Sequence, residues 1–202
     1  MRKIKAATFV SLDGVMQAPG GPKEDPSGGF AYGGWMFHYA DETTGKAVGE
    51  TFDKPFDLLL GRRTYDIFAA YWPNAPKDHP IAKSFNAVTK YVATHEPATL
   101  AWRNTEWLGR DPLAALRELK KQDGPDLLIQ GSSDLIQQLL GADLIDEIRL
   151  MVFPLLLGKG KRLFGEGTVP AALKLTGSQT SSTGVVIAAY ERGGEIRTGS
   201  FA

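Results

Sequence analysis

Two stretches of this chain follow the same plan: a short apolar run ends at a glycine, and a helical pattern begins at once. They read "DLLLGRRTYDIFAAYW" at 57–72 and "DLLIQGSSDLIQQLLG" at 126–141. A short apolar run bounded by glycine predicts a strand buried on both faces, and apolar residues three or four apart predict a helix. A strand followed directly by a helix, found twice, predicts a parallel sheet with helices on its faces.

The rest of the chain extends this alternation. The strand-like segments after about residue 153 have no helix between them, so we expect the chain to end in an antiparallel hairpin joined around 181–184. We therefore predict a single α/β domain over residues 1–202, with a mostly parallel central sheet and helices on both faces. The other predicted strands are 3–12, 87–96, 105–108 and 144–158, and the other predicted helices are 40–52 and 112–122.

The charge balance and the missing residue types narrow the function. Lysine plus arginine equals aspartate plus glutamate at 23 each, whereas nucleic-acid-binding chains have a basic excess, so we expect no nucleic-acid partner. Without cysteine, disulfides and cysteine-bound metals are excluded, and His38, His79 and His95 lack ligand spacing, so we expect no metal site. No apolar stretch approaches the roughly 20 residues that cross a bilayer, and the N-terminus lacks a signal-peptide pattern. We expect a cytoplasmic protein with no membrane partner.

Residues 13–34 form a long segment rich in glycine and proline, hereafter the 13–34 loop. One interpretation is a solvated surface loop. The other is a cover over a functional site, because long loops in compact domains often serve that role. Large apolar residues in and beside the loop favour the cover, and among them Met16 and Trp35 are our candidates for contact with a substrate.

Polar residues follow three of the predicted strands at the point where each strand ends. Ligands of open α/β sheets bind outside the carboxyl ends of the strands, where glycines admit close approach and free N–H groups and hydroxyls can hold a pyrophosphate. Each turn taken alone could equally be an ordinary helix cap. The three sets are Gly61, Arg62 and Thr64; Thr94 and His95; and Gly131, Ser132 and Ser133.

Three motifs resemble those of the dihydrofolate-reductase-like superfamily: "SLDGVM", "LLLGRRTYDIF" and "LLIQGSSDLIQQLL". The G-R-x-T at 61–64 is shared with dihydrofolate reductases. The S-L-D-G at 11–14 and the P-x-x-x-G-x-G at 154–160 point to the reductase domain of the riboflavin-biosynthesis deaminase-reductases and its free-standing relatives. The resemblance spans roughly residues 3–192 and implies a three-layer dihydrofolate-reductase-like fold.

This resemblance implies NADPH as the cofactor. Asp134, where some dihydrofolate reductases carry a basic residue, weakens the preference for NADPH over NADH, and Ser132 stands where relatives often carry a second glycine. By this resemblance, the residues that bind the adenosine side of the cofactor are Gly61, Arg62 and Thr64, with Arg62 as a phosphate ligand, and those of the 2′-phosphate region are Thr94 and His95. The pyrophosphate turn corresponds to Gly131, Ser132 and Ser133, with Leu135 in the helix beside it. The loop beside the nicotinamide corresponds to Leu12, Asp13 and Gly14.

The resemblance also implies a small-molecule acceptor of the pyrimidine or pterin kind, similar to 5-amino-6-(5-phosphoribosylamino)uracil. Asp13 is our candidate catalytic acid, with a turn residue as the alternative. Lys159 and Lys161 are candidates for an acceptor phosphate. Dihydrofolate reduction is less favoured, since no acid at 40–52 stands in a pterin-binding motif, and a non-catalytic nucleotide-binding module stays open.

The last part of the chain also bears on assembly. Residues 144–157 and 184–190 are more apolar than a sheet with one solvated face requires. Free-standing relatives in the family pair through this end of the sheet, so the resemblance implies a homodimer. The alternative is that the chain's own helices bury these strands.

Overall fold

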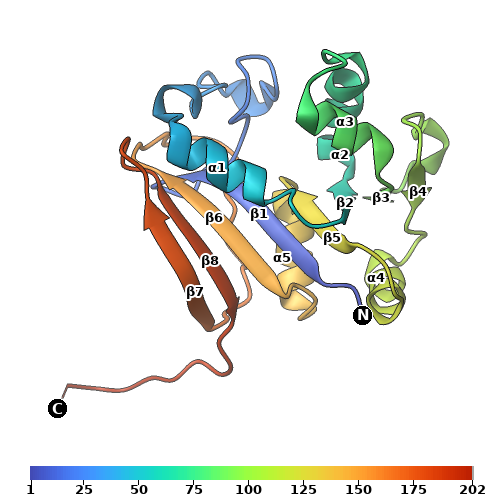
Figure 1. Cartoon of the computed structure of the whole chain (residues 1–202). Coiled ribbons are helices and arrows are strands. Elements are labelled where there is room, and N and C mark those ends of the chain that lie inside the picture. The colour runs from blue at the N-terminus through green and yellow to red at the C-terminus, as the bar shows by residue number, and fades with distance from the viewer. Residues whose placement is uncertain (202) are drawn as a thin grey trace.

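The computed structural model describes residues 1–201, and their strands form one eight-stranded sheet in the order β4-β3-β2-β5-β1-β6-β8-β7 (Figure 1). Pairing is parallel from β4 to β6 and antiparallel from β6 to β7. The prediction of a mostly parallel sheet with an antiparallel C-terminal hairpin is therefore confirmed. The strands are β1 Ile4–Ser11, β2 Phe56–Gly61, β3 Lys90–Ala93, β4 Thr105–Trp107, β5 Asp126–Gln130, β6 Glu147–Phe153, β7 Leu173–Thr180 and β8 Val186–Arg192.

Helices cover both faces of this sheet (Figure 1). One face packs on α4 and α5 through a cluster that includes Leu116, Ile129 and Leu139. The other face packs on α2 and α3 beside β2 and β3, and on α1 and the 13–34 loop beside β6 and β8. The α-helices are α1 Glu42–Glu50, α2 Arg62–Tyr71, α3 Pro80–Ala87, α4 Pro112–Lys121 and α5 Ser133–Gly141.

The main error of the sequence prediction lies between α2 and β4. The strand predicted at 87–96 is shorter than expected and is confined to β3, Lys90–Ala93. A helix that the sequence did not predict, α3, precedes it. Pro80 occupies the first turn of α3, and the Nδ1 atom of His79 accepts a hydrogen bond from the amide of Ala82. A histidine cap is not a standard helix-start signal, which is why the pattern was missed.

The strand predicted at 144–158 is also shorter than expected. It is confined to β6 and ends immediately before Pro154, since proline lacks the N–H that a ladder requires. Six of the apolar residues of 144–157 are buried within the chain: Leu144, Ile145, Ile148, Met151, Phe153 and Leu157. For these residues the alternative is correct, because the chain's own helices and the 13–34 loop bury them.

Two exposed apolar residues, Leu173 and Leu175, lie on the edge strand β7. All eight of its residues are exposed, and Leu175 is 51% accessible. β7 pairs with β8 on one side only, so its other edge is open.

Among residues 1–201, no helix is long and apolar enough to cross a membrane.

Candidate nucleotide-binding site

The carboxyl ends of β2 and β5 lie side by side, because these two strands pair in parallel. From β2 the chain passes into α2 and then to β3 on one side. From β5 it passes into α5 on the opposite face and then to β6, beyond β1, on the other side. When the connections after two neighbouring parallel strands run toward opposite sides of the sheet, a crevice opens at the carboxyl ends of these strands. Such a crevice is the usual ligand site of open α/β sheets.

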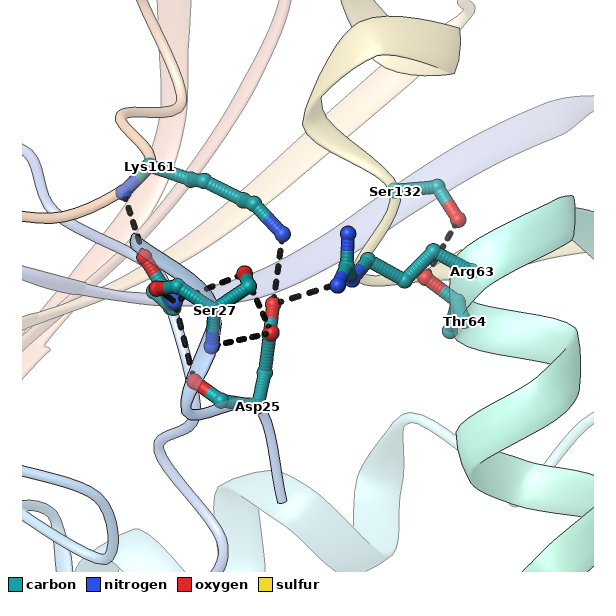
Figure 2. Close-up of polar contacts among 7 residues, drawn as sticks. Asp25, Ser27, Arg63, Thr64, Ser132 and Lys161 are labelled. Atoms are coloured by element: carbon teal, nitrogen blue, oxygen red, sulfur yellow. Dashed lines mark hydrogen bonds and ion pairs between the residues drawn. The ribbon is translucent and has the colours of Figure 1, made fainter. Parts of the chain in front are cut away.

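Ser132 joins the two turns at this crevice. The amide of Gly61 donates to the Ser132 Oγ atom at 3.0 Å. That hydroxyl in turn donates to the Thr64 Oγ1 atom at 2.7 Å (Figure 2). A Cβ atom at position 61 would lie 3.2 Å from the same Oγ atom, so glycine permits this close approach. Gly131 has φ +83°, and Ser132 itself has a left-handed backbone, φ 63°. The structure therefore brings together Gly61, Thr64, Gly131 and Ser132, as the sequence predicts.

The helices that begin at these turns lack side-chain caps. Among the five α-helices of residues 1–201, α1, α3 and α4 begin with a side chain that accepts a backbone N–H. α2 and α5 have no such cap, since Gly61 has no side chain and the Ser132 hydroxyl is turned to Thr64. Their first N–H groups are left for another acceptor, and an anion is favoured by the helix dipole. Ser133 and Leu135 lie in the first turn of α5.

Arg62, the first residue of α2, is held by partners within the chain. Its Nε atom donates to both carboxylate oxygens of Asp66 at 2.9 Å. Its Nη1 atom donates to the carbonyl of Glu96 at 3.0 Å and to the Thr99 hydroxyl at 2.6 Å. Arg62 thus holds the loop after β3 against α2.

That loop contains Thr94 and His95. It starts at the end of β3, where Ala93 pairs with Gly61, so it lies beside the first turn of α2. The Thr94 Oγ1 atom accepts the amide of Glu96 at 3.0 Å, and the His95 side chain is exposed. The predicted set of Thr94 and His95 therefore lies next to the set of Gly61, Arg62 and Thr64.

Asp13, after β1, is surrounded by hydrogen-bond donors. Its carboxylate accepts from the Ser11 hydroxyl at 2.6 Å and from the amides of Leu157 and Gly158 at 3.1 and 2.9 Å. The Ser11 hydrogen bond and these two amides outweigh the effect of burial and lower the pKa of Asp13 to about 2. A carboxylate with this pKa is ionised at neutral pH, so the environment favours the turn role over proton donation.

The remaining predicted residues of the N-terminal region differ in exposure. Leu12 is 66% accessible, and Gly14 has φ +81° in the turn that Asp13 supports. Met16 and Trp35 are both buried in apolar clusters, and the Trp35 indole N–H donates to the Gln17 carbonyl at 2.8 Å. In this structure Met16 and Trp35 stabilise the 13–34 loop.

Asp25, which no sequence pattern singled out, lies at the centre of the polar cluster in Figure 2. Its Oδ1 atom accepts from the Ser27 hydroxyl at 2.6 Å, and its Oδ2 atom accepts from the Lys161 ammonium at 2.6 Å. The same Oδ2 atom lies 3.4 Å from the Nε atom of Arg63, on the first turn of α2. Burial alone would raise the pKa of Asp25, but the Lys161 and Ser27 hydrogen bonds outweigh it and lower the pKa. An acid within a glycine- and proline-rich loop gave no signal of this pairing.

A small pocket adjoins the crevice on the face of the sheet that α1 covers. Gln130, directly before the Gly131 turn, contributes to its wall, and so does Arg149 of β6. Arg149 donates to the Ala47 carbonyl at 3.3 Å and lies 3.7 Å from the Glu50 carboxylate. Arg149 was not among the predicted site residues, although a charged residue in the middle of an apolar strand is a signal of a functional position. The pocket is lined by Ala7, Thr8, Phe9, Val48, Thr51, Gln130, Arg149 and Met151.

A larger hollow of about 630 Å³ lies between α2 and residues 99–103. Its walls include none of the glycines or serines of the two turns. We locate the candidate site by the uncapped helices and the paired turns, since these provide specific polar groups, which size alone does not.

The architecture is that of the dihydrofolate-reductase-like class. A dihydrofolate reductase from Enterococcus faecalis, in complex with NADP(H), superposes with a TM-score of 0.59 at 14% identity, covering 95% of this chain and 96% of that one. A protein from Shewanella sp. PV-4 that has been proposed to act in riboflavin biosynthesis superposes with a TM-score of 0.67 at 20% identity, covering 94% and 98%.

The chain belongs to the family described as the RibD C-terminal domain, whose model matches residues 2–187. Within the curated proteins it is 29% identical over 140 residues to the uncharacterized protein YyaP of Bacillus subtilis (strain 168), covering 68% of this chain and 74% of that one. The resemblance inferred from the motifs is therefore confirmed.

Proposed function

We propose that this protein is an NADPH-dependent reductase that transfers hydride to a small heterocyclic acceptor of the pyrimidine or pterin type. The observation that carries the proposal is the pair of uncapped helices, α2 and α5, whose N-termini meet at the carboxyl ends of β2 and β5. The RibD C-terminal family and the dihydrofolate-reductase-like architecture support it. NADPH supplies the hydride when it is bound.

The turns provide the contacts to the dinucleotide. The first amides of α2 and α5 donate to the pyrophosphate, and the Thr64 and Ser132 hydroxyls complete the cradle. Gly61 and Gly131 let the backbone approach closely. Arg62 contacts the 2′-phosphate region and holds the loop that carries Thr94 and His95 beside it. Leu135 packs in the core and so supports the first turn of α5.

The loop after β1 positions the reacting end. Asp13 holds the Leu12–Gly14 turn against residues 157–158 through the hydrogen bonds described above. In our proposal this fixed backbone lies beside the nicotinamide, and Asp13 has a positioning role. Hydride transfer needs such orientation and a dry pocket more than it needs a titrating acid at this position.

We place the acceptor beside Gln130, on the α1 side of the crevice. The pocket there has a volume of about 10 Å³, room for about one water, so α1 would have to shift outward for a ring to enter. The Gln130 side chain presents both a donor and an acceptor, which matches the alternating N–H and C=O groups of a pyrimidine or pterin ring. Glu50 is paired with Arg149, and Asp41 caps α1 by accepting the amide of Thr44, so neither acid is free to bind a pterin. This arrangement favours a pyrimidine-type acceptor over dihydrofolate.

We also propose that the protein is a homodimer through β7 and β8. Leu173, Leu175 and Val186 are exposed on this antiparallel end, and the outer edge of β7 is unpaired. A stable interface buries more than about 1,000 Å² with an apolar centre.

Oxidation of NADPH, followed with a panel of pyrimidine, pterin and flavin-related acceptors, tests the proposal. We expect turnover with at least one acceptor, and a lower kcat/KM for Gln130→Leu than for the control Gln122→Leu, at an exposed position after α4. Binding of NADPH without turnover on any acceptor would favour the alternative, a non-catalytic nucleotide-binding module.

A further inference from the structure

The hollow of about 630 Å³ between α2 and residues 99–103 lies apart from the crevice, and the function proposed above does not use it. Its volume falls within the range of small-molecule sites, roughly 300–1,000 Å³. Tyr65 and Ala69 of α2 contribute to one wall, and Ala101 and Trp102 contribute to the other. Aromatic rings and alanine methyl groups make this part of the hollow suited to a flat apolar body.

Two cations meet where Asn86 and Arg103 form part of the wall of the hollow. The Nε atom of Arg103 donates to the Asn86 carbonyl at 3.1 Å, and the Lys90 ammonium donates to the same oxygen at 3.3 Å. The Asn104 side chain donates to it as well, at 3.4 Å. A carbonyl oxygen has two lone pairs, so these three donors outnumber the acceptor sites that they share.

The positive charge of this cluster is not neutralised by the chain. Within residues 1–201, neither Arg103 nor Lys90 forms an ion pair with a carboxylate. Asp66, the acid in the wall of the hollow, is already paired with Arg62. Asp57, the acid whose charge acts on Lys90, forms a buried ion pair elsewhere. Burial and, after it, the charge of Arg103 lower the pKa of Lys90 to about 8, so both side chains are still largely charged at pH 7.

Arg103 is the cation of this pair that a ligand can reach. It is exposed, and its Nη1 and Nη2 atoms have no partner among residues 1–201. Lys90 is 0% accessible, and its Nζ atom lies 4.5 Å from the centroid of the Trp102 ring, so it adds charge without contact. A single accessible guanidinium fork matches the two oxygens of one carboxylate.

We propose that this hollow is a second binding site, for a small carboxylic acid with a flat apolar body. The carboxylate accepts from Nη1 and Nη2 of Arg103, and the body lies between Ala69 and Ala101. The proposal goes beyond the reductase function and does not rest on it, since the walls of the hollow include none of the glycines or serines of the two turns.

Calorimetry with 2-naphthoate, 2-naphthamide and acetate tests the two parts of this chemistry. The amide keeps the flat body without the charge, and acetate keeps the charge without the body. The parent chain should bind 2-naphthoate at least about 10-fold more tightly than either, because only 2-naphthoate uses both the guanidinium and the apolar walls. Absence of 2-naphthoate binding at millimolar concentration, or equal binding of 2-naphthamide, would overturn the proposal.

Arg103→Gln tests the assigned residue. It should weaken 2-naphthoate by about 10- to 100-fold, the worth of a charge-assisted hydrogen bond, and leave 2-naphthamide unchanged. Its melting temperature should match that of the parent chain, because the Asn86 carbonyl keeps its other two donors. Arg117→Gln removes the same charge from an exposed position on α4 and should bind 2-naphthoate like the parent chain. Equal loss in the two variants, or no loss in Arg103→Gln, would overturn the role of Arg103.

Competition with NADPH separates the hollow from the crevice. Saturating NADPH should not displace 2-naphthoate, because the two are assigned to different walls. Displacement would place the carboxylate in the crevice and overturn the second site. A chain that binds 2-naphthoate as expected but binds neither NADPH nor NADH would overturn the reductase proposal and leave this one standing.

Discussion

The parallel half of the sheet and its antiparallel end use the same kind of strand for different purposes. β2 and β5 are covered on both faces, and their ends are fastened to each other by Ser132. β7 has every residue exposed and one edge unpaired. The first arrangement fixes the backbone amides that we propose for the cofactor, and the second leaves Leu173 and Leu175 exposed on the edge that we propose for the dimer. Binding and assembly are thus expected to be separable by mutation.

The largest effect should come from a side chain in the β5–α5 turn. Gly131→Val puts a β-branched residue at φ +83° and a Cβ atom 3.4 Å from Thr64, so it should lower stability by about 1–3 kcal/mol and abolish measurable NADPH binding. Gly109→Val has the same backbone cost, with φ +79° and open space around it, and should keep binding. Denaturant unfolding and calorimetry measure both variants, and equal loss of NADPH binding in the two would contradict the assignment of the turn.

Asp13→Asn should have the next largest effect. The pKa of Asp13 is lowered to about 2, so the native carboxylate contributes stability that is present above pH 4 and lost as the pH falls toward 2. The variant should be less stable by about 1–2 kcal/mol at pH 7 and should lack this acid-side slope. NADPH affinity should remain nearly intact while turnover falls, as measured by unfolding at several pH values and steady-state kinetics. Full turnover with lowered stability would reduce Asp13 to a turn residue.

Two lysines, Lys90 in the parallel part of the sheet and Lys174 at its antiparallel end, test how strongly each region excludes water from a charged side chain. Lys90 of β3 is 0% accessible and donates to the Val88 carbonyl at 2.7 Å, and burial lowers its pKa to about 8. Between pH 8 and 10.5 the unfolded chain holds a proton that the native chain has lost, so stability should rise with pH across that window. Lys90→Met should remove this rise and change stability at pH 7 by about 1 kcal/mol.

The matched change on the antiparallel end is Lys174→Met. Lys174 is 70% accessible on β7, so the substitution should leave the pH dependence of unfolding unchanged. Thermal unfolding from pH 7 to 10.5 measures both variants. Equal slopes in the parent chain and in Lys90→Met would show that Lys90 is more hydrated than its burial indicates.

The smallest effect on stability should come from the exposed edge. Leu175→Glu on β7 should change the free energy of unfolding by less than about 0.5 kcal/mol, because Leu175 is half exposed. It should nevertheless convert the proposed dimer to a monomer, detected by light scattering as a fall in mass to 21.9 kDa. A parent chain that already scatters as a monomer at micromolar concentration would rule out the dimer.

The sequence by itself determined the layout of the sheet and the two turns at its centre. Gly61 and Gly131 each end an apolar run and precede a helical pattern, and local signals of this kind depend on neighbours in the chain. Helix α3 was not found, because its cap is a histidine whose role is visible only in the folded backbone.

Only the tertiary structure decided which charges meet. Arg63 and Asp25 are separated by 38 positions in the chain, and Lys161 is 136 positions beyond Asp25, yet all three meet at one carboxylate. The same holds for Asp13, whose amide partners are more than 140 residues away. Ion pairs and long-range hydrogen bonds carry no periodicity, so no pattern in one chain can reveal them before the sheet brings its strand ends together.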